Sequence, residues 1–317
     1  MMRIGLDIMG GDFAPDNTID GAIAALDGIG DDTLVLLGDE TVIRSALQQR
    51  SVAPERFDIV HTPETITMEE KPLRALQEKP DSGIAIGFRM LVKKEIDAFS
   101  SAGNSGAMVA GAASIVRTID RVIRPCTATM IPQEEGPDSV MLDIGTTPDA
   151  KPDVMLQFGM LGSIYAQAVL GIERPRVSLI NVGAEDGKGN LQCQAAFRLM
   201  KDTPYFHFVG NMEPRDLFKN KADVFVADGF VGNILIKQIE TFYRLFQKRR
   251  FSDPLFDRFN YELYGGSPIL GVNAPVVLGH GISSALAIKN MVLLSRSMYK
   301  NKMTERINHM FEQYVSN

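Results

Sequence analysis

The stretch that decides the fold is R-I-G-L-D-I-M-G-G-D-F-A-P, which runs from Arg3 to Pro15. Apolar residues alternate with Gly, Asp and Met in its first half, and this pattern predicts a short strand. Two glycines, an aspartate and a proline end the strand, and residues 16–18, D-N-T, offer side chains that cap a helix. A glycine turn between strand and helix also lets an anion reach backbone N–H groups. A tight turn with capping aspartates and a binding site are equally good interpretations, and the candidate site residues are Asp7, Gly10, Gly11 and Asp12.

The composition is that of a folded protein without nucleic-acid character. The chain has 317 residues, of which 45% are hydrophobic, and its formal net charge of -6 lacks the basic surface of a nucleic-acid binder. Cys126 and Cys193 lie far apart, with neither metal-ligand spacing nor a disulfide framework, which is typical of a reducing compartment. The chain begins directly with a strand pattern, and no apolar stretch predicts a membrane span. We therefore expect a soluble cytoplasmic protein without a signal peptide.

Strand-like and helix-like patterns alternate along the chain. Strands are predicted at Thr33–Leu37, Phe57–Val60, Ala98–Ser100, Val140–Ile144, Val177–Val182, Phe206–Val209, Val224–Ala227 and Val276–Leu278. Amphipathic segments lie between most of them, for example at Gly83–Ile96, Pro152–Leu170 and Ser284–Tyr299. This alternation predicts an α/β protein with a largely parallel sheet that is covered by helices on both faces. No Pro- or Ser-rich linker divides the sequence, so we expect a single α/β domain over residues 1–317.

Glycine-rich polar motifs follow many of the predicted strands. They include S-A-G-N-S-G-A, L-D-I-G, N-V-G-A-E-D-G-K-G-N, D-G-F-V-G-N, G-V-N-A-P and G-H-G. Ligands of parallel α/β sheets bind at the carboxyl ends of the strands, so several such motifs predict one shared polar pocket. The candidates that these motifs add are Gly103, Asn104, Ser105, Gly106, Asp143, Asn181, Glu185, Asp186, Lys188, Asp228, Asn233, Asn273 and His280.

Known cofactor and metal motifs fit poorly. The stretch G-A-E-D-G-K-G from Gly183 resembles a Walker loop, but it is one residue short and has Gly189 where Ser or Thr binds magnesium. Neither a complete Rossmann fingerprint nor a G-x-S-x-G or H-E-x-x-H motif occurs, and the histidines do not pair at ligand spacing. We expect no cofactor and no metal.

The order of these motifs resembles that of the phosphate acyltransferase family, the acyl-carrier-protein:phosphate transacylases. The matching motifs begin with D-I-M-G-G-D-x-x-P and end with Y-G-G-S-P-I-L-G-V-N-A-P. The resemblance as a whole runs from the first strand to the last helix. The resemblance implies a three-layer α/β/α sandwich similar to isopropylmalate dehydrogenases and phosphotransacetylases, and a homodimer. It also implies transfer of a long-chain acyl group from acyl carrier protein to inorganic phosphate. The acyl phosphate then goes to a membrane-bound glycerol-phosphate acyltransferase for phospholipid synthesis.

The chemistry of this reaction fits the residues. A thioester has a good leaving group and phosphate is itself a nucleophile, so no Ser or Cys triad is needed. Gly103–Gly106 and Lys188 suit the phosphate, and N–H groups near Gly232 or His280 suit the oxyanion. The expected catalytic residues are Lys188, His280, Asn233 and Asp228.

Three other functions remain as alternatives. A phosphotransacetylase acting on acyl-coenzyme A shares the fold and the reaction. A β-decarboxylating dehydrogenase shares the fold, but it needs a nicotinamide site and metal-binding aspartates that the sequence lacks. A non-catalytic acyl-binding regulator needs no strand-end Lys188, Asn104 or His280.

Two segments differ from the pattern of the family. Residues 146–147 are Thr-Thr where relatives usually have Ala-Asn, and the helical hairpin expected at about residues 236–264 is shorter than in many relatives. A basic-aromatic tip in this hairpin suits an anionic membrane or the carrier protein, whereas ordinary helix packing with a solvated charge run is equally plausible. The tip consists of Lys248, Arg249, Arg250, Phe251 and Phe256. We expect peripheral membrane association of a cytoplasmic enzyme.

Overall fold

The computed structural model describes residues 1–314, and contacts divide the chain into two compact units. Unit 1 comprises Met1–Thr118 and Tyr261–Lys300. Unit 2 comprises Ile119–Asn260 and the described residues from Asn301 onward. The single domain expected over residues 1–317 stays a prediction. Within these residues, the structure shows two compact units.

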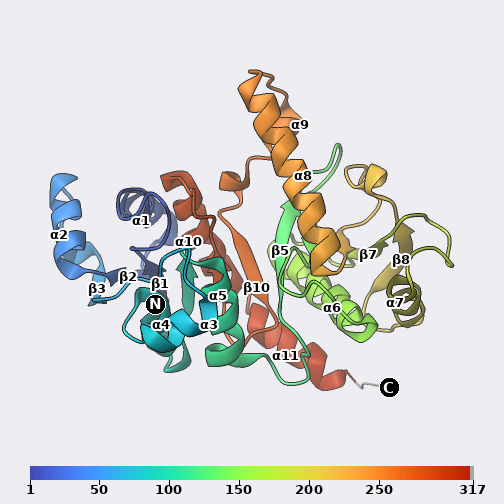
Figure 1. The fold of residues 1–317 in the computed structure, drawn as a ribbon, viewed down its shortest axis with the longest axis horizontal. Coiled ribbons are helices and arrows are strands. Elements are labelled where there is room, and N and C mark those ends of the chain that lie inside the picture. The colour runs from blue at the N-terminus through green and yellow to red at the C-terminus, as the bar shows by residue number, and fades with distance from the viewer. Residues whose placement is uncertain (315–317) are drawn as a thin grey trace. The chain divides into compact units, whose positions relative to one another are not determined.

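Unit 1 is built on a mostly parallel group of strands (Figure 1). The strands are β1 (Arg3–Asp7), β2 (Thr33–Gly38), β3 (Asp58–His61), β4 (Ala98–Ser101), β10 (Ser267–Leu270) and β11 (Val276–Leu278). They lie in the order β3-β2-β1-β4-β11-β10, and neighbours are parallel except for the antiparallel pair β10–β11. The helices are α1 (Asp16–Ile29), α2 (Glu40–Gln49), α3 (Pro72–Glu78), α4 (Gly83–Val92), α5 (Ser105–Gly111) and α10 (Ala285–Lys300), and a π-helix, Ala112–Arg117, follows α5.

Helices cover both faces of the unit 1 strands. Phe99 of β4 packs its ring against Gly87 of α4, whereas the hydroxyl of the next residue, Ser100, lies 2.6 Å from that of Ser295 in α10. Successive side chains of a strand point to opposite faces, so α4 and α10 lie on opposite sides.

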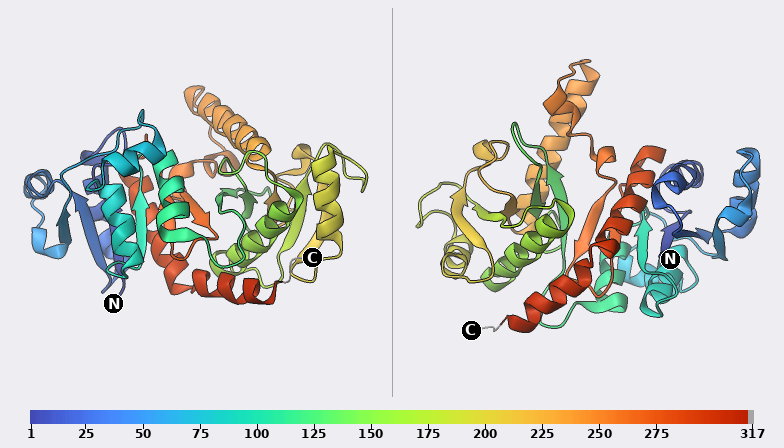
Figure 2. Two further views of the ribbon diagram at one scale, coloured as in Figure 1. Left: turned by 60° about the horizontal axis from the view of Figure 1, so that its bottom comes forward. Right: turned by 180° about the vertical axis from the view of Figure 1, so that it is seen from behind.

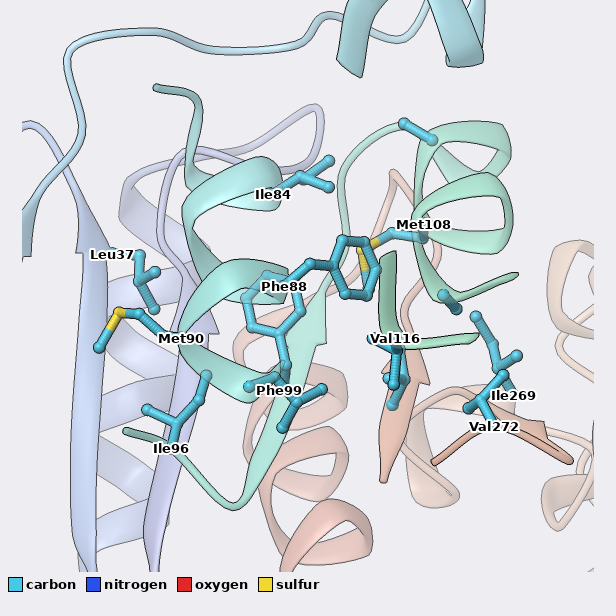
Figure 3. Packing of buried hydrophobic residues seen from close by; sticks show 14 of the residues in the cluster. Leu37, Ile84, Phe88, Met90, Ile96, Phe99, Met108, Val116, Ile269 and Val272 are labelled. Atoms are coloured by element: carbon cyan, nitrogen blue, oxygen red, sulfur yellow. The ribbon is translucent and has the colours of Figure 1, made fainter. Parts of the chain in front are cut away.

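The α4 side of unit 1 holds a large apolar core. Phe88 and Phe99 meet edge to face with ring centroids 5.2 Å apart, and Figure 3 shows Ile84, Met108 and Val116 among the residues around them. Both rings are fully buried, and burying one such ring contributes roughly 2 kcal/mol. This core fixes β4 and α5, and therefore the glycine turn between them.

Unit 2 has the same layered construction. Its strands are β5 (Cys126–Ile131), β6 (Ser139–Leu142), β7 (Arg176–Ile180), β8 (His207–Met212) and β9 (Val224–Val226). They lie in the order β5-β6-β9-β7-β8, and only β5–β6 is antiparallel. The helices are α6 (Pro152–Val169), α7 (Leu191–Lys201), α8 (Gly229–Lys248), α9 (Pro254–Asp257) and α11 (Met303–Gln313).

The two long helices α6 and α8 lie on opposite faces of unit 2. Gly162 of α6 rests against Leu142 and Val224, whereas the adjacent strand residues Met141 and Phe225 belong to the core cluster that α8 covers. Alternation along β6 and β9 therefore separates the two helices. The predicted α/β/α sandwich with a largely parallel sheet is confirmed in each unit.

Several local predictions need correction. Strands β5 and β10 were not predicted, because C-T-A-T-M-I is short and mixed and S-P-I-L contains a proline. The predicted capping of α1 by residues 16–18 is wrong, since Pro15 precedes the helix without a side-chain cap. Thr18 instead donates its hydroxyl to the Ile8 carbonyl at 2.6 Å, which ties the helix to the end of the first strand.

The predicted hairpin corresponds to the outer part of α8 and to α9. Helix α8 begins at Gly229, earlier than the expected start near residue 236. Figure 2 shows α8 and α9, in orange, standing out from the rest of unit 2. Within residues 1–314, no helix is both long and apolar enough to cross a membrane.

Candidate functional site

The first group of candidate residues lies in unit 1, where β1 ends in a buried carboxyl group. Asp7 Oδ2 accepts a hydrogen bond of 2.7 Å from the Ser101 hydroxyl, and Oδ1 accepts one of 3.2 Å from the Met9 N–H. Ser101 Oγ in turn accepts from the Gly103 N–H at 2.9 Å. Burial raises the pKa of Asp7 to about 6, against the lowering effect of the Ser101 hydrogen bond. The turns after β1 and β4 are therefore joined through Asp7.

Gly10 and Gly11 form the turn that lies over this carboxyl group. A Cβ on Gly10 would lie 2.5 Å from Asp7 Oδ2 and 2.7 Å from the Gly103 nitrogen, so a side chain has no room there. Gly11 has a φ of 112°, which L residues rarely adopt. The exposed Asp12 donates its N–H to the Gly281 carbonyl at 2.7 Å. The structure thus brings Asp7, Gly10, Gly11, Asp12 and Gly103 together.

Asn104 is buried and its side chain is fully used within unit 1. Its Oδ1 accepts from the Ala107 N–H at 2.9 Å and so caps α5, and its Nδ2 donates to the Thr67 and Glu70 carbonyls at 2.9 and 3.0 Å. This residue fastens the loop before α3 to the start of α5. Ser105 is exposed as the first residue of α5, and Gly106 packs closely against Pro72.

The last two unit 1 candidates lie at opposite ends of β11. His280 follows the carboxyl end of β11, and its ring meets that of Tyr261 edge to face at 4.6 Å. Asn273 precedes β11 and donates Nδ2 to the Arg117 and Thr118 carbonyls at 3.1 and 3.0 Å. Because β11 and β4 are parallel, Asn273 lies at the edge away from Gly103, and the structure does not bring it to the glycine turns.

The second group lies in unit 2, where Asp143 follows β6. Asp143 is fully buried, and Oδ1 accepts from the Thr127 N–H and hydroxyl at 3.0 and 3.1 Å, while Oδ2 accepts from the Thr147 N–H at 2.6 Å. Asp228 caps α8 by accepting from the Val231 N–H at 2.8 Å. Burial raises the pKa of Asp228, and the nearby acids Asp149 and Asp143 add to this.

The first turn of α8 packs closely on the Asp143 turn. Gly229 donates its N–H to the Thr147 carbonyl at 2.9 Å, and Gly232 has the Asp143 carbonyl directly against it. Asn233 is exposed on α8, and its Oδ1 would lie 3.6 Å from a Cβ on Gly145. The structure therefore brings Asp143, Asp228 and Asn233 to one helix start.

Asn181 organises the loop that carries Lys188. Its Nδ2 donates to the Lys188 carbonyl and to Asn211 Oδ1, both at 3.1 Å, while its Oδ1 accepts from the Val182 N–H at 2.8 Å. Asn211 donates to the Glu185 carbonyl at 2.9 Å. The backbone of the loop is held firmly by buried amides, although the loop itself is exposed.

The charged side chains of this loop point into solvent. Lys188 Nζ lies 4.0 Å from Glu185 Oε1, and the side chains are 51% and 72% exposed. Asp186 pairs with Lys201 of α7 at 2.8 Å. Asp186 and Lys188 each belong to a surface ion pair, and the longer Lys188–Glu185 pair leaves the half-exposed ammonium group of Lys188 able to meet an anion.

The candidate tip lies where α8 leads into α9. The rings of Phe246 and Phe256 lie 4.8 Å apart, and Phe251 packs on both at 5.6 and 5.7 Å. Phe256 is half-buried in this cluster, whereas Phe251 stays 50% exposed. Lys248, Arg249 and Arg250 are all exposed beside the rings.

Sequence reasoning missed several supporting residues. Ser101 stands inside the recognised motif S-A-G-N-S-G-A, and Asn211 lies in β8. Their bonds to Asp7 and Asn181 link strands that are separated in sequence. Thr62, just after β3, is 2% exposed, and within residues 1–314 its hydroxyl is the single buried side-chain oxygen or nitrogen without a hydrogen-bond partner. The sequence analysis did not single out Thr62, and its position directly after a strand is the one signal that could have found it.

Comparison with known proteins gives a consistent family. A family model described as "Fatty acid synthesis protein" matches residues 2–306. The chain is 37% identical over 325 residues to the phosphate acyltransferase of Dictyoglomus turgidum and 38% identical over 327 residues to that of Brevibacillus brevis, covering 96% of each chain in both cases. The chain belongs to the phosphate acyltransferase family. The predicted family is confirmed, and the chain is an acyltransferase.

Solved structures agree with this fold. The chain resembles the EutD phosphotransacetylase from Staphylococcus aureus with a TM-score of 0.63, and a phosphotransacetylase from Streptococcus pyogenes with a TM-score of 0.65. Each comparison covers 94% of both chains at 16% identity, which shows the fold alone. The expected likeness to phosphotransacetylases is confirmed.

Proposed function

We propose that this acyltransferase transfers a long-chain acyl group from acyl carrier protein to inorganic phosphate. The observation that carries the proposal is the near full-length match to phosphate acyltransferases. The acyl phosphate then serves a membrane-bound glycerol-phosphate acyltransferase in phospholipid synthesis. That the acyl donor is acyl carrier protein is inferred from the resemblance of the sequence motifs to this family.

The proposed reaction needs little from the protein beyond binding and electrostatics. A phosphate oxygen attacks the thioester carbonyl carbon and forms a C–O bond, and the tetrahedral oxyanion then collapses with cleavage of the C–S bond. The thiolate of the carrier leaves readily, because a thiol with a pKa of about 8.5 is a good leaving group. The thiolate then takes up a proton from solvent. Hydrogen-bond donors at the oxyanion and a dry environment for the acyl phosphate are the remaining requirements.

Roles for the candidate residues follow from these requirements. In unit 1, the N–H groups of the Gly10–Gly11 turn suit phosphate, whereas Asp7, Ser101 and Asn104 hold this turn and the neighbouring Gly103 turn in place. In unit 2, Lys188 supplies a mobile positive charge for phosphate. The side-chain amide of Asn233, which is exposed near the start of α8 beside the capping residue Asp228, suits an oxyanion.

The proposal includes a homodimer and reversible contact with an anionic membrane. Apolar side chains on α8 support an additional partner surface, since four of them stay 45–62% exposed: Phe230, Ile234, Phe242 and Leu245. The aromatic cluster beside Lys248, Arg249 and Arg250 supports the membrane contact. Light scattering of the purified chain tests the dimer, and a monomer at micromolar concentration would contradict it.

The decisive experiment is a turnover assay. The protein is incubated with palmitoyl-carrier protein and phosphate, and acyl phosphate is trapped with hydroxylamine. We expect product that depends on phosphate and on neither nucleotide nor metal, so that EDTA leaves the rate unchanged. No product from the carrier-bound donor, with product from palmitoyl-coenzyme A, would instead support a phosphotransacetylase.

A further inference from the structure

Three large apolar side chains stay exposed beside the glycine turns of unit 1. Phe13 is 54% exposed, Met68 41% and Ile282 42%. Exposed apolar side chains are common singly, but a group of them at a polar site indicates contact with an apolar ligand.

The backbone places these three residues close together. Asp12 donates to the Gly281 carbonyl at 2.7 Å, and Phe13 and Ile282 are the next residues on the two sides of this bond. Met68 reaches the same point from the loop before α3, since its methyl carbon would lie 3.1 Å from a Cβ on Gly281. We call Phe13, Met68 and Ile282 the apolar rim.

The rim adjoins the polar turns through bonded neighbours. A Cβ on Gly11 would lie 3.2 Å from the Gly281 carbonyl oxygen, so the rim begins where the Gly10–Gly11 turn ends. Asn104 donates to the carbonyls on either side of Met68, one residue before it and two after it. In unit 1, the Gly10–Gly11 turn therefore lies between the buried carboxyl group of Asp7 and the apolar rim.

We infer that the rim binds the acyl chain of the substrate and makes Phe13, Met68 and Ile282 determinants of chain-length preference. This inference rests on the proposed function. An acyl phosphate carries an anionic head joined to an apolar chain, and unit 1 presents N–H groups and apolar side chains in the same order. Long chains reach the rim, whereas a butyryl chain has too few methylenes to cover it.

The test compares donors of two lengths. The variant Met68→Ser/Ile282→Ser is assayed with palmitoyl- and butyryl-carrier protein, beside Met68→Leu, which keeps the apolar contact. Val92→Ser at the end of α4 is the matched control, because Val92 is 52% exposed but belongs to no such group. We expect kcat/KM for the palmitoyl donor to fall about tenfold in the double variant and to change less than about twofold for the butyryl donor. Met68→Leu and Val92→Ser should keep the wild-type ratio.

The outcomes separate the inference from the proposed function. A wild-type protein that makes no acyl phosphate from either donor overturns the proposed function. If the wild type is active and the double variant keeps the wild-type ratio of kcat/KM for the palmitoyl and butyryl donors, the inference alone is overturned. This holds also when both values fall by the same factor. Thermal unfolding of each variant shows that the fold is intact, and Phe13→Ser repeats the test on the other side of the rim.

Discussion

The glycine turns of unit 1 and the Lys188 loop of unit 2 both follow parallel strands, but they hold their polar groups differently. Asp7 is 4% exposed, and both of its oxygens accept hydrogen bonds. Lys188, Glu185 and Asp186 all lie in solvent. The glycines show the same contrast: a Cβ on Gly10 would clash with its neighbours, whereas a Cβ on Gly187 would meet no non-adjacent residue within 4 Å.

This difference separates what each region contributes. A buried, bonded turn is preorganised, so its residues matter for folding as well as for binding. An exposed loop adds little to stability, and a charged side chain there acts only when a ligand arrives. We therefore expect substitutions in the first region to lower stability and substitutions in the second to lower activity alone.

The largest expected effect is on the glycine pair that illustrates the contrast. Gly10→Ala should lower the free energy of unfolding by about 3 kcal/mol, because the new methyl meets Asp7, Gly103 and Ser101 within 2.8 Å. Gly187→Ala, the matched control, should change it by less than about 1 kcal/mol. Urea unfolding of both variants measures this, and equal stabilities would show that the turn is not tightly packed.

Lys188→Ala tests the open loop. Turnover should fall by roughly two orders of magnitude, the scale of one electrostatic stabiliser, while the thermal midpoint stays within a degree or two of wild type. Lys201→Ala is the control, because Lys201 is a similarly exposed lysine at the end of α7 that pairs with Asp186 of the Lys188 loop. Wild-type turnover in Lys188→Ala would remove this residue from the site.

The sequence predicted the layers of the fold and most of its parallel strands, because apolar runs and amphipathic segments alternate clearly. It missed β5 and β10, which are the antiparallel additions. The pattern of β10 contains Pro268, and the pattern of β5 mixes threonine with apolar residues. Pairing with a neighbouring strand, rather than local preference, makes both of them strands.

The motifs of the candidate site could be predicted from the sequence, but the role of each residue within them could not. Asn104 and Asn181 stand in glycine-rich motifs as a binding residue would, yet their amides are used for capping and for holding loops. Asn273 matched a motif before β11 and lies at the opposite edge. These outcomes depend on partners distant in sequence, such as Thr67 and Asn211, which a local pattern does not reveal.

The buried carboxyl group of the first region predicts a pH-dependent stability. Burial raises the pKa of Asp7 from 3.8 to about 6, so between these values only the folded protein holds the proton. Its contribution is complete below the unfolded pKa and is lost as pH rises through 6. From about pH 4.5 to pH 7 the loss is about 2 kcal/mol.

Asp7→Asn should lack this part of the slope. Urea unfolding of wild type and variant at the two pH values gives it as a difference, in which the other titrating groups cancel. Asp32→Asn is the control: hydrogen bonds from Met2, Arg296 and Lys300 outweigh burial and lower the Asp32 pKa to about 2, so it titrates below this range. Parallel slopes for wild type and Asp7→Asn would mean that Asp7 is ionised at both pH values.

The smallest effect concerns the exposed end of unit 2, which tests whether openness there serves a surface rather than a small ligand. Each basic residue near an anionic membrane is worth about 1 kcal/mol, so Lys248, Arg249 and Arg250 should give weak binding that salt screens. Phe251→Asp should lower partitioning to phosphatidylglycerol vesicles about tenfold, since it replaces a half-exposed ring with a charge that anionic lipid repels. Leu199→Asp on α7 carries the same charge change at a residue 43% exposed and should bind like wild type. Equal sedimentation of Phe251→Asp and wild type with anionic and neutral vesicles would show that the aromatic cluster only ends a helix.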